Sequence, residues 1–189
     1  TIIPSRRYNV NIISKLDGVS QKALLCNSVN TVRNGDTSEG FTTDGYGFVS
    51  AVKAKCDGTI PKDVLIYGYG GASRAIAFEC IENGCTVSFA VREKSLNNCL
   101  ALCNEIKQKL NVKTEAFAIS NIPSDRHSSL LVNATPVGMY PNNGTSPVDL
   151  ERFHLCSGVI DMIYNPAKTN TKIEDTLKRC LTCSIFFSF

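Results

Sequence analysis

The sequence lacks the features that would place it at a membrane or on a nucleic acid. No apolar run reaches the roughly 18 to 20 residues that a membrane-spanning helix needs, and the opening residues 1–7 lack a signal-peptide pattern. The 20 basic and 17 acidic residues are spread along the chain without a basic block. We therefore expect a soluble, cytoplasmic protein with no membrane and no nucleic-acid partner.

The nine cysteines do not form a recognisable disulfide or metal pattern. Their number is odd and their spacing scattered, which is not the framework of a small secreted domain. Cys180 and Cys183 form a close pair, but without a second pair or a nearby histidine they supply at most half a zinc site. We expect no metal, and cysteines that are mostly reduced and buried.

Strands and helices alternate through most of the chain. Helices are expected at 72–82 and 95–110. Short apolar runs bounded by turn residues predict five strands, at 64–67, 86–91, 114–119, 130–134 and 158–163. This alternation predicts an α/β fold with a Rossmann-like, doubly wound parallel sheet.

The segment before the first of these strands has a different pattern. Val10, Ile12, Ile13 and Leu16 form an apolar stripe that predicts a helix ending near Gly18. Further along, the pattern predicts a short helix at 21–25, a hairpin from strand 29–32 through turn 33–36 to a return arm at 39–43, and a helix from Asp44 to about Lys55.

A glycine-rich turn follows the strand at 64–67 directly. Gly68, Tyr69, Gly70, Gly71, Ala72 and Ser73 fit the dinucleotide-binding fingerprint, with Ser73 at the third glycine position. Gly68 would permit the tight turn and Gly70 the close approach of a pyrophosphate, while the following helix directs its N–H groups at the phosphates. The alternative is an ordinary glycine-rich connection between strand and helix.

The end of the second predicted strand indicates which dinucleotide is bound. Arg92 lies 24 residues after Gly68, and Lys94 adds a second positive charge. An arginine at this place accommodates the 2′-phosphate of NADP, whereas an acidic residue would bind the ribose hydroxyl of NAD. We expect NADP rather than NAD, although Glu93 could serve a ribose and Arg92 could simply be a solvated surface residue.

Five segments together resemble one family, the shikimate dehydrogenases. They occur in family order over residues 17 to 169. The segments, each beside the family pattern it resembles, are 27–32 (GAVNT), 40–48 (GxNTDxxGF), 68–75 (GAGGASRA), 133–139 (NATPxGM) and 161–166 (DxxYNP).

The resemblance implies reversible hydride transfer between NADPH and the ketone carbon of 3-dehydroshikimate, which gives shikimate in aromatic amino-acid biosynthesis. It implies that Asn30, Asp44 and Tyr164 contact the substrate, and that Met162 joins Arg92 and the glycine turn in holding the cofactor. Asp44 would be half of a catalytic Lys/Asp pair, since an alkoxide formed by hydride arrival needs a proton. The alternatives to these substrate-binding roles are structural: Asp44 would be a helix N-cap and Asn30 a turn residue.

The family's catalytic lysine has no secure counterpart. Aligning the proline of the family pattern on Pro4 puts Arg6 in the lysine's place, and this is the alignment we prefer. Other alignments give Lys15 or, without gaps, Asn9. An arginine can stabilise an oxyanion but does not readily donate a proton, so Arg6 predicts low activity.

The resemblance also implies a domain division and an incomplete enzyme. Residues 1–45 would be the last part of a substrate-binding α/β domain, and residues 46–189 the NADP-binding domain. The family's carboxylate-binding serines would precede Thr1, and the apolar tail 183–189 matches no family segment. Three hypotheses follow: a shikimate dehydrogenase, either alone or fused to or associated with dehydroquinate dehydratase; an NADP-binding fragment without catalysis; or a quinate dehydrogenase.

Overall fold

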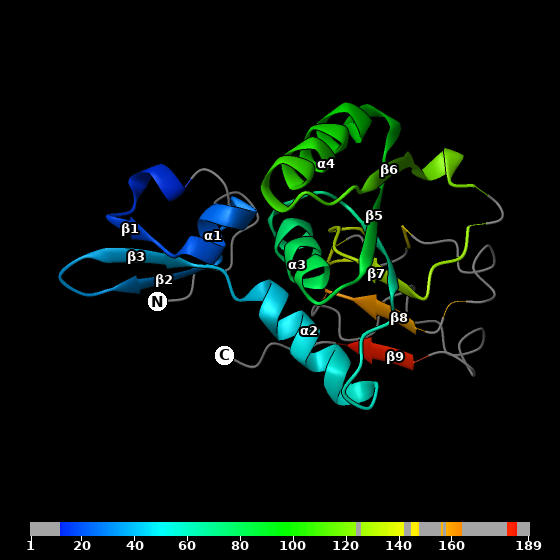
Figure 1. The fold of residues 1–189 in the computed structure, drawn as a ribbon, viewed down its shortest axis with the longest axis horizontal. Coiled ribbons are helices and arrows are strands. Elements are labelled where there is room, and N and C mark those ends of the chain that lie inside the picture. Colours follow the sequence, from blue (N-terminus) through cyan, green and yellow to red (C-terminus); the bar gives the residue numbers. More distant parts are fainter. Residues whose placement is uncertain are drawn as a thin grey trace.

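A six-stranded parallel sheet forms the centre of the computed structural model, which describes residues 12–123, 126–141, 145–147, 156, 158–163 and 181–184. The strands are β4 (Asp63–Tyr67), β5 (Thr86–Val91), β6 (Glu115–Ala118), β7 (Leu130–Asn133), β8 (Gly158–Asp161) and β9 (Leu181–Ser184). Their order across the sheet is β6-β5-β4-β7-β8-β9 (Figure 1). With β4 counted as the first strand, this is the Rossmann order 3-2-1-4-5-6.

Three helices pack on one face of this sheet. They are α2 (Asp44–Lys55), α3 (Gly71–Glu82) and α4 (Leu96–Leu110). Their apolar sides share one buried cluster with the strands, in which Phe48, Ile76 and Ile106 are fully buried. A second, smaller cluster around Leu65, Tyr67 and Leu131 covers the opposite face. The strands are therefore buried on both faces, as parallel strands usually are.

A separate three-stranded sheet lies to one side (Figure 1). Its strands β1 (Gly18–Val19), β2 (Thr31–Asn34) and β3 (Ser38–Phe41) have the order β1-β3-β2, with β2 and β3 antiparallel. Helix α1 (Gln21–Cys26) packs on it, and only Ala23, Val29 and Val32 are buried in their common core. We call residues 12–41 the small module; its core is too thin to stabilise it without neighbours.

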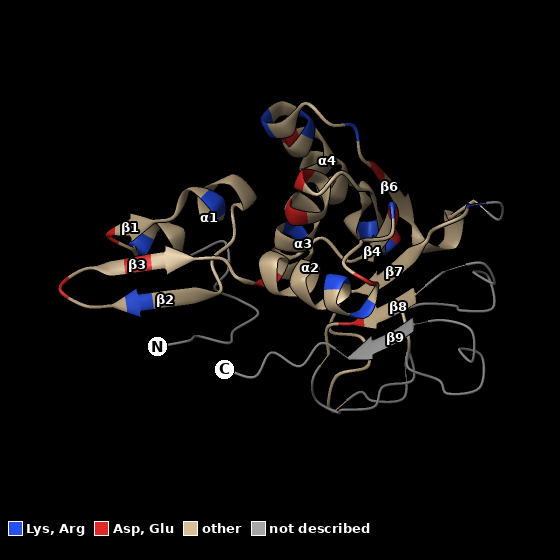
Figure 2. Ribbon diagram, turned by 60° about the horizontal axis from the view of Figure 1, so that its bottom comes forward, with Lys and Arg blue, Asp and Glu red and all other residues tan. Residues whose placement is uncertain are grey.

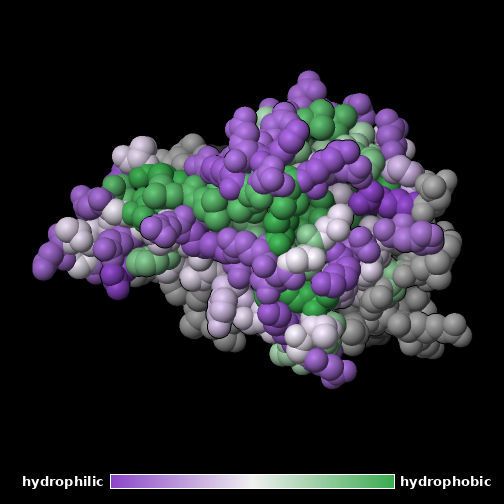
Figure 3. All heavy atoms as spheres, in the orientation of Figure 1, coloured by the Kyte–Doolittle hydropathy of each residue, from purple (hydrophilic) through white to green (hydrophobic). Residues whose placement is uncertain are grey.

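The surface of the small module is partly apolar. Figure 3 shows a band of apolar surface that runs over α1 toward α3, and the side chain of Leu24 on α1 is 52% exposed. Figure 2 shows Lys and Arg segments distributed over β2, α1, α2 and α4, with Asp and Glu segments among them. None of the described helices combines the length and the apolar character that crossing a bilayer requires.

The structure confirms most of the predicted elements and corrects two. All five predicted strands and the hairpin are present, with their ends shifted by a few residues. The predicted first helix is wrong where it is described, because residues 13–15 form a single 3-10 turn before β1. Strand β9 was not predicted: Leu181–Ser184 pairs with β8, so this part of the chain is not merely an apolar tail.

Candidate functional site

The glycine-rich turn after β4 has one crowded side and one open side. Gly68 has φ +105°, and a Cβ atom there would lie 3.1 Å from both the Ser73 hydroxyl and the Thr135 methyl carbon. This conformation and this crowding both require glycine. At Gly70, by contrast, a Cβ atom would meet nothing within 4 Å. The turn therefore leaves open space beside the backbone of Gly70.

The N-terminus of α3 is free to bind an anion at that open space. Gly70 is its N-cap and no side chain caps it, so the N–H groups of the first turn, from Gly71 and Ala72 onward, have no partner within the helix. Ser73 is fully buried, and its hydroxyl has no hydrogen-bond partner. Free N–H groups and the positive end of the helix dipole together fit a phosphate group.

Two exposed cations lie at the same edge of the sheet. The Gly68 N–H donates to the Ala90 carbonyl at 3.0 Å, which joins the turn to the end of β5. Arg92 follows β5 directly, and both Arg92 and Lys94 are exposed. Tyr69, in the turn itself, is half-buried against the core beneath. The predicted cofactor residues from β4 and β5 therefore share the carboxyl edge of two neighbouring strands.

Polar side chains lie at the carboxyl ends of the neighbouring strands β7 and β8. The buried Asn133 amide donates to Asp161 Oδ1 at 3.1 Å and accepts from the Thr135 hydroxyl at 2.7 Å. The Met162 N–H donates to the Asn133 carbonyl at 3.0 Å, which fixes the predicted cofactor residue Met162 just beyond β8. We predicted no role for Asn133, Thr135 and Asp161 from the sequence. A polar residue at the end of each of two neighbouring parallel strands could have indicated that they lie together.

The ends of β4 and β7 coincide with the topological switch point of the sheet. The connection from β4 crosses to β5 on one side, whereas β7 lies on the other side of β4. The Ala134 carbonyl lies 3.2 Å from the Cβ position of Gly68, so the two loops meet there. Open α/β sheets bind ligands outside the carboxyl ends of the strands at this point.

Asn30 and Asp44 form a second cluster, on the small module and at the start of α2. The Asn30 amide nitrogen donates to Asp44 Oδ1 and, at 3.1 Å, to the Thr43 hydroxyl. Its oxygen accepts the Thr43 N–H at 2.9 Å. Burial raises the pKa of Asp44, and the hydrogen bond from Asn30 partly offsets that rise. The structure thus brings together the two described residues expected to contact substrate.

The N-cap of α2 is Thr43, so the alternative prediction that Asp44 is the N-cap is wrong by one position. Asp44 is the first residue of the helix. Asn30 immediately precedes β2, so it is not a turn residue after a strand. Neither side chain is therefore explained by the local role that the sequence offered as an alternative.

Close packing of α2 on α3 brings this cluster toward the glycine turn. A Cβ atom on Gly45 would lie 2.3 Å from the Ala75 carbonyl oxygen and 2.9 Å from the Glu79 Cβ. Gly45 follows Asp44 directly, and Ala75 lies in the second turn of α3. The close approach at Gly45 therefore fixes Asp44 relative to the helix that begins at Gly71.

The partner expected for Asp44 is not seen in the described part of the chain. Lys15 is exposed in the 3-10 turn and makes no ion pair with Asp44. Arg6, the preferred counterpart of the catalytic lysine, and Tyr164, the third predicted substrate contact, both lie outside the described residues. Among the residues that are described, no cation pairs with the Asp44 carboxylate.

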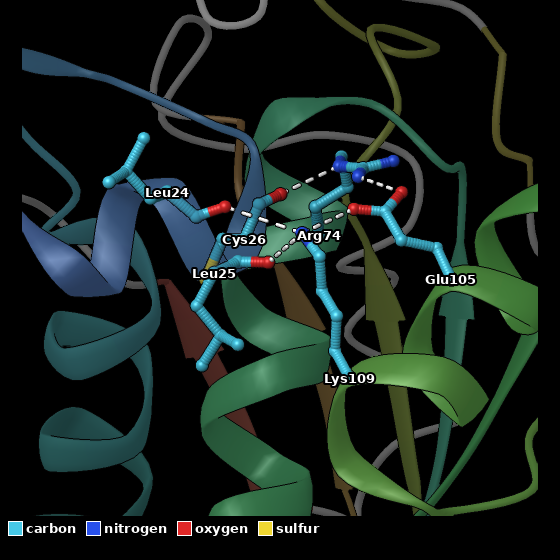
Figure 4. Close-up of polar contacts among 6 residues, drawn as sticks. All are labelled: Leu24, Leu25, Cys26, Arg74, Glu105 and Lys109. Atoms are coloured by element: carbon cyan, nitrogen blue, oxygen red, sulfur yellow. Dashed lines mark hydrogen bonds and ion pairs between the residues drawn. The ribbon is translucent and has the colours of Figure 1, made fainter.

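A cluster of two cations and one carboxylate joins the small module to the helices of the large sheet (Figure 4). Arg74, on α3, donates from Nε to the Cys26 carbonyl at 2.7 Å and pairs with Glu105 on α4. Lys109 donates to the Leu25 carbonyl at 2.7 Å and to Glu105 at 2.8 Å. Carbonyl groups at the end of α1 have no helical partners, so these two cations satisfy them. We call Arg74, Glu105 and Lys109 the clamp.

The raised pKa of Asp44 makes the stability of the fold depend on pH. Because the folded state holds this proton more tightly than the unfolded state, Asp44 lowers the free energy of unfolding as pH rises through its folded pKa. Asp44→Asn removes the charge and keeps an oxygen for the Asn30 amide. We expect its free energy of unfolding to match the wild type near about pH 3 and to exceed it near about pH 7. Urea unfolding at the two pH values measures these free energies. If the variant differed from the wild type by the same amount at both pH values, the expectation would be contradicted.

Comparison with known sequences finds relatives among the shikimate dehydrogenases. No family model matches the sequence. The shikimate dehydrogenase (NADP(+)) of Methanocaldococcus jannaschii is 34% identical over 166 residues, which are 86% of this chain and 58% of the relative. The chain therefore spans a little over half the length of the curated relatives that it matches.

Solved structures agree with the sequence comparison. A crystal structure of a shikimate dehydrogenase in complex with NADP+ is 31% identical with a TM-score of 0.81, covering 95% of this chain and 63% of that one. The shikimate 5-dehydrogenase of Listeria monocytogenes, in complex with shikimate and NAD, is 29% identical with a TM-score of 0.79, covering 95% of this chain and 65% of that one.

Proposed function

This chain belongs to the shikimate dehydrogenase family, and we propose on that premise that it carries the NADP site and part of the substrate site of an NADP-dependent shikimate dehydrogenase. The reaction is the reversible reduction of 3-dehydroshikimate to shikimate. The observation that carries the proposal is the free N-terminus of α3 beside the open space at Gly70, at the switch point of the sheet.

Residues at the carboxyl edge of the sheet would hold the cofactor. The backbone of the turn from Gly68 to Ser73 would bind the pyrophosphate, because it offers free N–H groups and no side chain at Gly70. Arg92, with Lys94 nearby, would bind the 2′-phosphate as a charged donor. Met162 would lie along the cofactor from the end of β8. The nicotinamide ring, when bound, supplies or accepts the hydride.

The substrate would lie between this edge and the Asn30–Asp44 cluster. A carboxylate and an amide can bind adjacent hydroxyls of a polyol, and the Asn30 amide already orients Asp44 Oδ1. Reduction leaves an alkoxide on the substrate, which must receive a proton. Arg6 or Lys15 would be the cation beside Asp44 at that stage, and Tyr164 would complete the contacts. Burial raises the pKa of Asp44, and a cation beside it would lower that pKa and keep the carboxylate charged.

Shikimate-dependent formation of NADPH by the purified chain tests the proposal. Turnover with shikimate and NADP that exceeds turnover with quinate or NAD would support it. Asp44→Asn should then abolish turnover and leave NADP binding intact, which separates the two halves of the site. Faster turnover with quinate would favour a quinate dehydrogenase instead.

A second candidate function is NADP binding without catalysis. The observation that favours it is that Lys15, the described candidate for the catalytic lysine, is exposed and makes no ion pair with Asp44. NADP binding by a folded chain that shows no turnover with shikimate or quinate would support this candidate over the first.

Arg92 should distinguish NADP from NAD. We expect Arg92→Ala to weaken NADP binding about tenfold, equivalent to about 1.4 kcal/mol, because it removes a charged donor to the 2′-phosphate. NAD lacks that phosphate, so its affinity should not change. Lys107→Ala, which removes an exposed charge from α4, is the matched control. Equal weakening of both dinucleotides by Arg92→Ala would contradict the assignment.

A further inference from the structure

We propose that Cys80 and Cys85 are a peroxide-reactive thiol pair that closes to an intrachain disulfide. The pair lies where α3 ends, at the opposite end of that helix from the glycine turn. The Cys85 N–H donates to the Cys80 carbonyl at 3.0 Å, and the Gly84 N–H donates to the Ile81 carbonyl at 2.9 Å. Gly84 has φ +79°. These two bonds and the left-handed glycine define a Schellman motif.

The Schellman motif brings the two cysteine side chains together. The residue that follows the left-handed glycine usually makes an apolar contact with a residue in the last turn of the helix. Here both positions are cysteine, and their thiols are close enough for Cys80 to lower the pKa of Cys85. A backbone hydrogen bond joins Cys85 directly to Cys80, so we expect their α carbons to lie within the roughly 4.4 to 6.8 Å over which disulfides form.

Burial and charge make Cys85 the attacking thiol of the pair. Cys85 is 6% exposed and Cys80 is fully buried, so a small oxidant reaches Cys85 first. Lys53 donates to the Asn83 side chain at 2.8 Å, and Lys62 Nζ lies 3.9 Å from the Cβ position of Gly84. The hydrogen bond from Cys80 and the charges of these two lysines lower the pKa of Cys85, against burial and Asp63. A thiolate is the nucleophile in such reactions.

The chemistry needs hydrogen peroxide as its only co-reactant. The Cys85 thiolate attacks one peroxide oxygen, the O–O bond breaks, and the products are a Cys85 sulfenic acid and hydroxide. The Cys80 thiol then attacks the Cys85 sulfur, which forms the S–S bond and releases the sulfenic oxygen as water. The hydroxide takes up the proton that Cys85 lost on ionising, so two thiols are oxidised by two electrons and one peroxide is reduced to two waters.

A second pair in the same core provides an internal control. Cys99 and Cys103 are buried and four residues apart within α4, and Cys99 lowers the pKa of Cys103. Side chains at that spacing hold their Cβ atoms about 5 to 6 Å apart, whereas a disulfide requires about 3.5 to 4.5 Å. Cys99 and Cys103 therefore cannot bridge without distorting the helix, and we expect no disulfide there.

Peptide mapping of the full chain after peroxide treatment tests the proposal. Both cysteines lie in one tryptic peptide, 75–92, and the control pair lies in another, 95–107. We expect peptide 75–92 to become lighter by two hydrogen atoms and to recover its mass on reduction. Cleavage after Glu82 separates the cysteines, so the fragments should stay joined until they are reduced. Peptide 95–107 should form no internal disulfide.

Two variants separate the attacking and resolving roles. In Cys80→Ser, Cys85 should accumulate as a sulfenic acid that dimedone traps, because no resolving thiol is present. In Cys85→Ser, Cys80 should remain unmodified because it is buried. Free thiols in peptide 75–92 of the treated wild-type chain, or equal bridging in peptide 95–107, would overturn the proposal without reference to either variant.

Discussion

Gly45→Ala should lower the free energy of unfolding by about 3 kcal/mol, the upper end of the range for overpacked cores. The added methyl carbon would lie 2.3 Å from the Ala75 carbonyl oxygen, and a backbone atom cannot move aside as a flexible side chain can. Helices α2 and α3 would have to separate. Urea denaturation of the two proteins measures the difference, and Asp44 should lose its position beside α3 at the same time.

Gly70→Ala is the matched control for this prediction. A methyl group on Gly70 meets nothing within 4 Å, and its φ of −73° suits any residue. We expect the free energy of unfolding to change by less than about 1 kcal/mol, the scale of an N-cap substitution. If both variants lost the same stability, the close approach at Gly45 would not be what holds α2 against α3.

Removal of the Arg74 guanidinium should cause the second-largest loss in the free energy of unfolding. Arg74→Met keeps the apolar stem of the side chain but loses its donors to the Cys26 carbonyl and to Glu105. The Arg74 side chain is only 11% exposed, so the partners it leaves are poorly reached by water. We expect the free energy of unfolding to fall by about 2 to 3 kcal/mol, typical of hydrogen bonds to a charged group.

The consequence of this loss should concentrate in the small module. Its core contains only three buried apolar side chains, so its attachment depends on contacts such as the clamp. Hydrogen exchange should therefore increase most in β2 and β3 of Arg74→Met. Lys109→Met is the control, since its side chain is 32% exposed and exposed pairs contribute at most about 1 kcal/mol. Equal losses from the two variants would contradict a special role for Arg74.

The local parts of the fold were predictable from the sequence. Each strand of the large sheet up to β8 is a short apolar run with turn residues at its ends. The glycine fingerprint is recognisable from the residue types that its turn requires. The position of Gly68, Gly70 and Arg92 on one edge follows from parallel pairing alone. These features need no knowledge of which segments pack together.

The features that depend on distant partners were not predictable. Gly45 is one of two glycines in the helical pattern at 44–55, and only the fold shows that Ala75, thirty positions later, packs against it. Arg74 belongs to a recognised motif, but its targets are carbonyl groups of α1. The apolar stripe at residues 10–16 is too short to distinguish a helix from the 3-10 turn that forms before β1.

Binding of NADP to the folded chain, followed by titration calorimetry, tests the central claim most directly. The account predicts saturable binding by the wild-type chain and little or none by Gly70→Ala, because a side chain would occupy the open space where the pyrophosphate lies. A wild-type chain that is folded and does not bind NADP, or a Gly70→Ala variant that binds it equally well, would contradict the claim that the turn from Gly68 to Ser73 is the cofactor site.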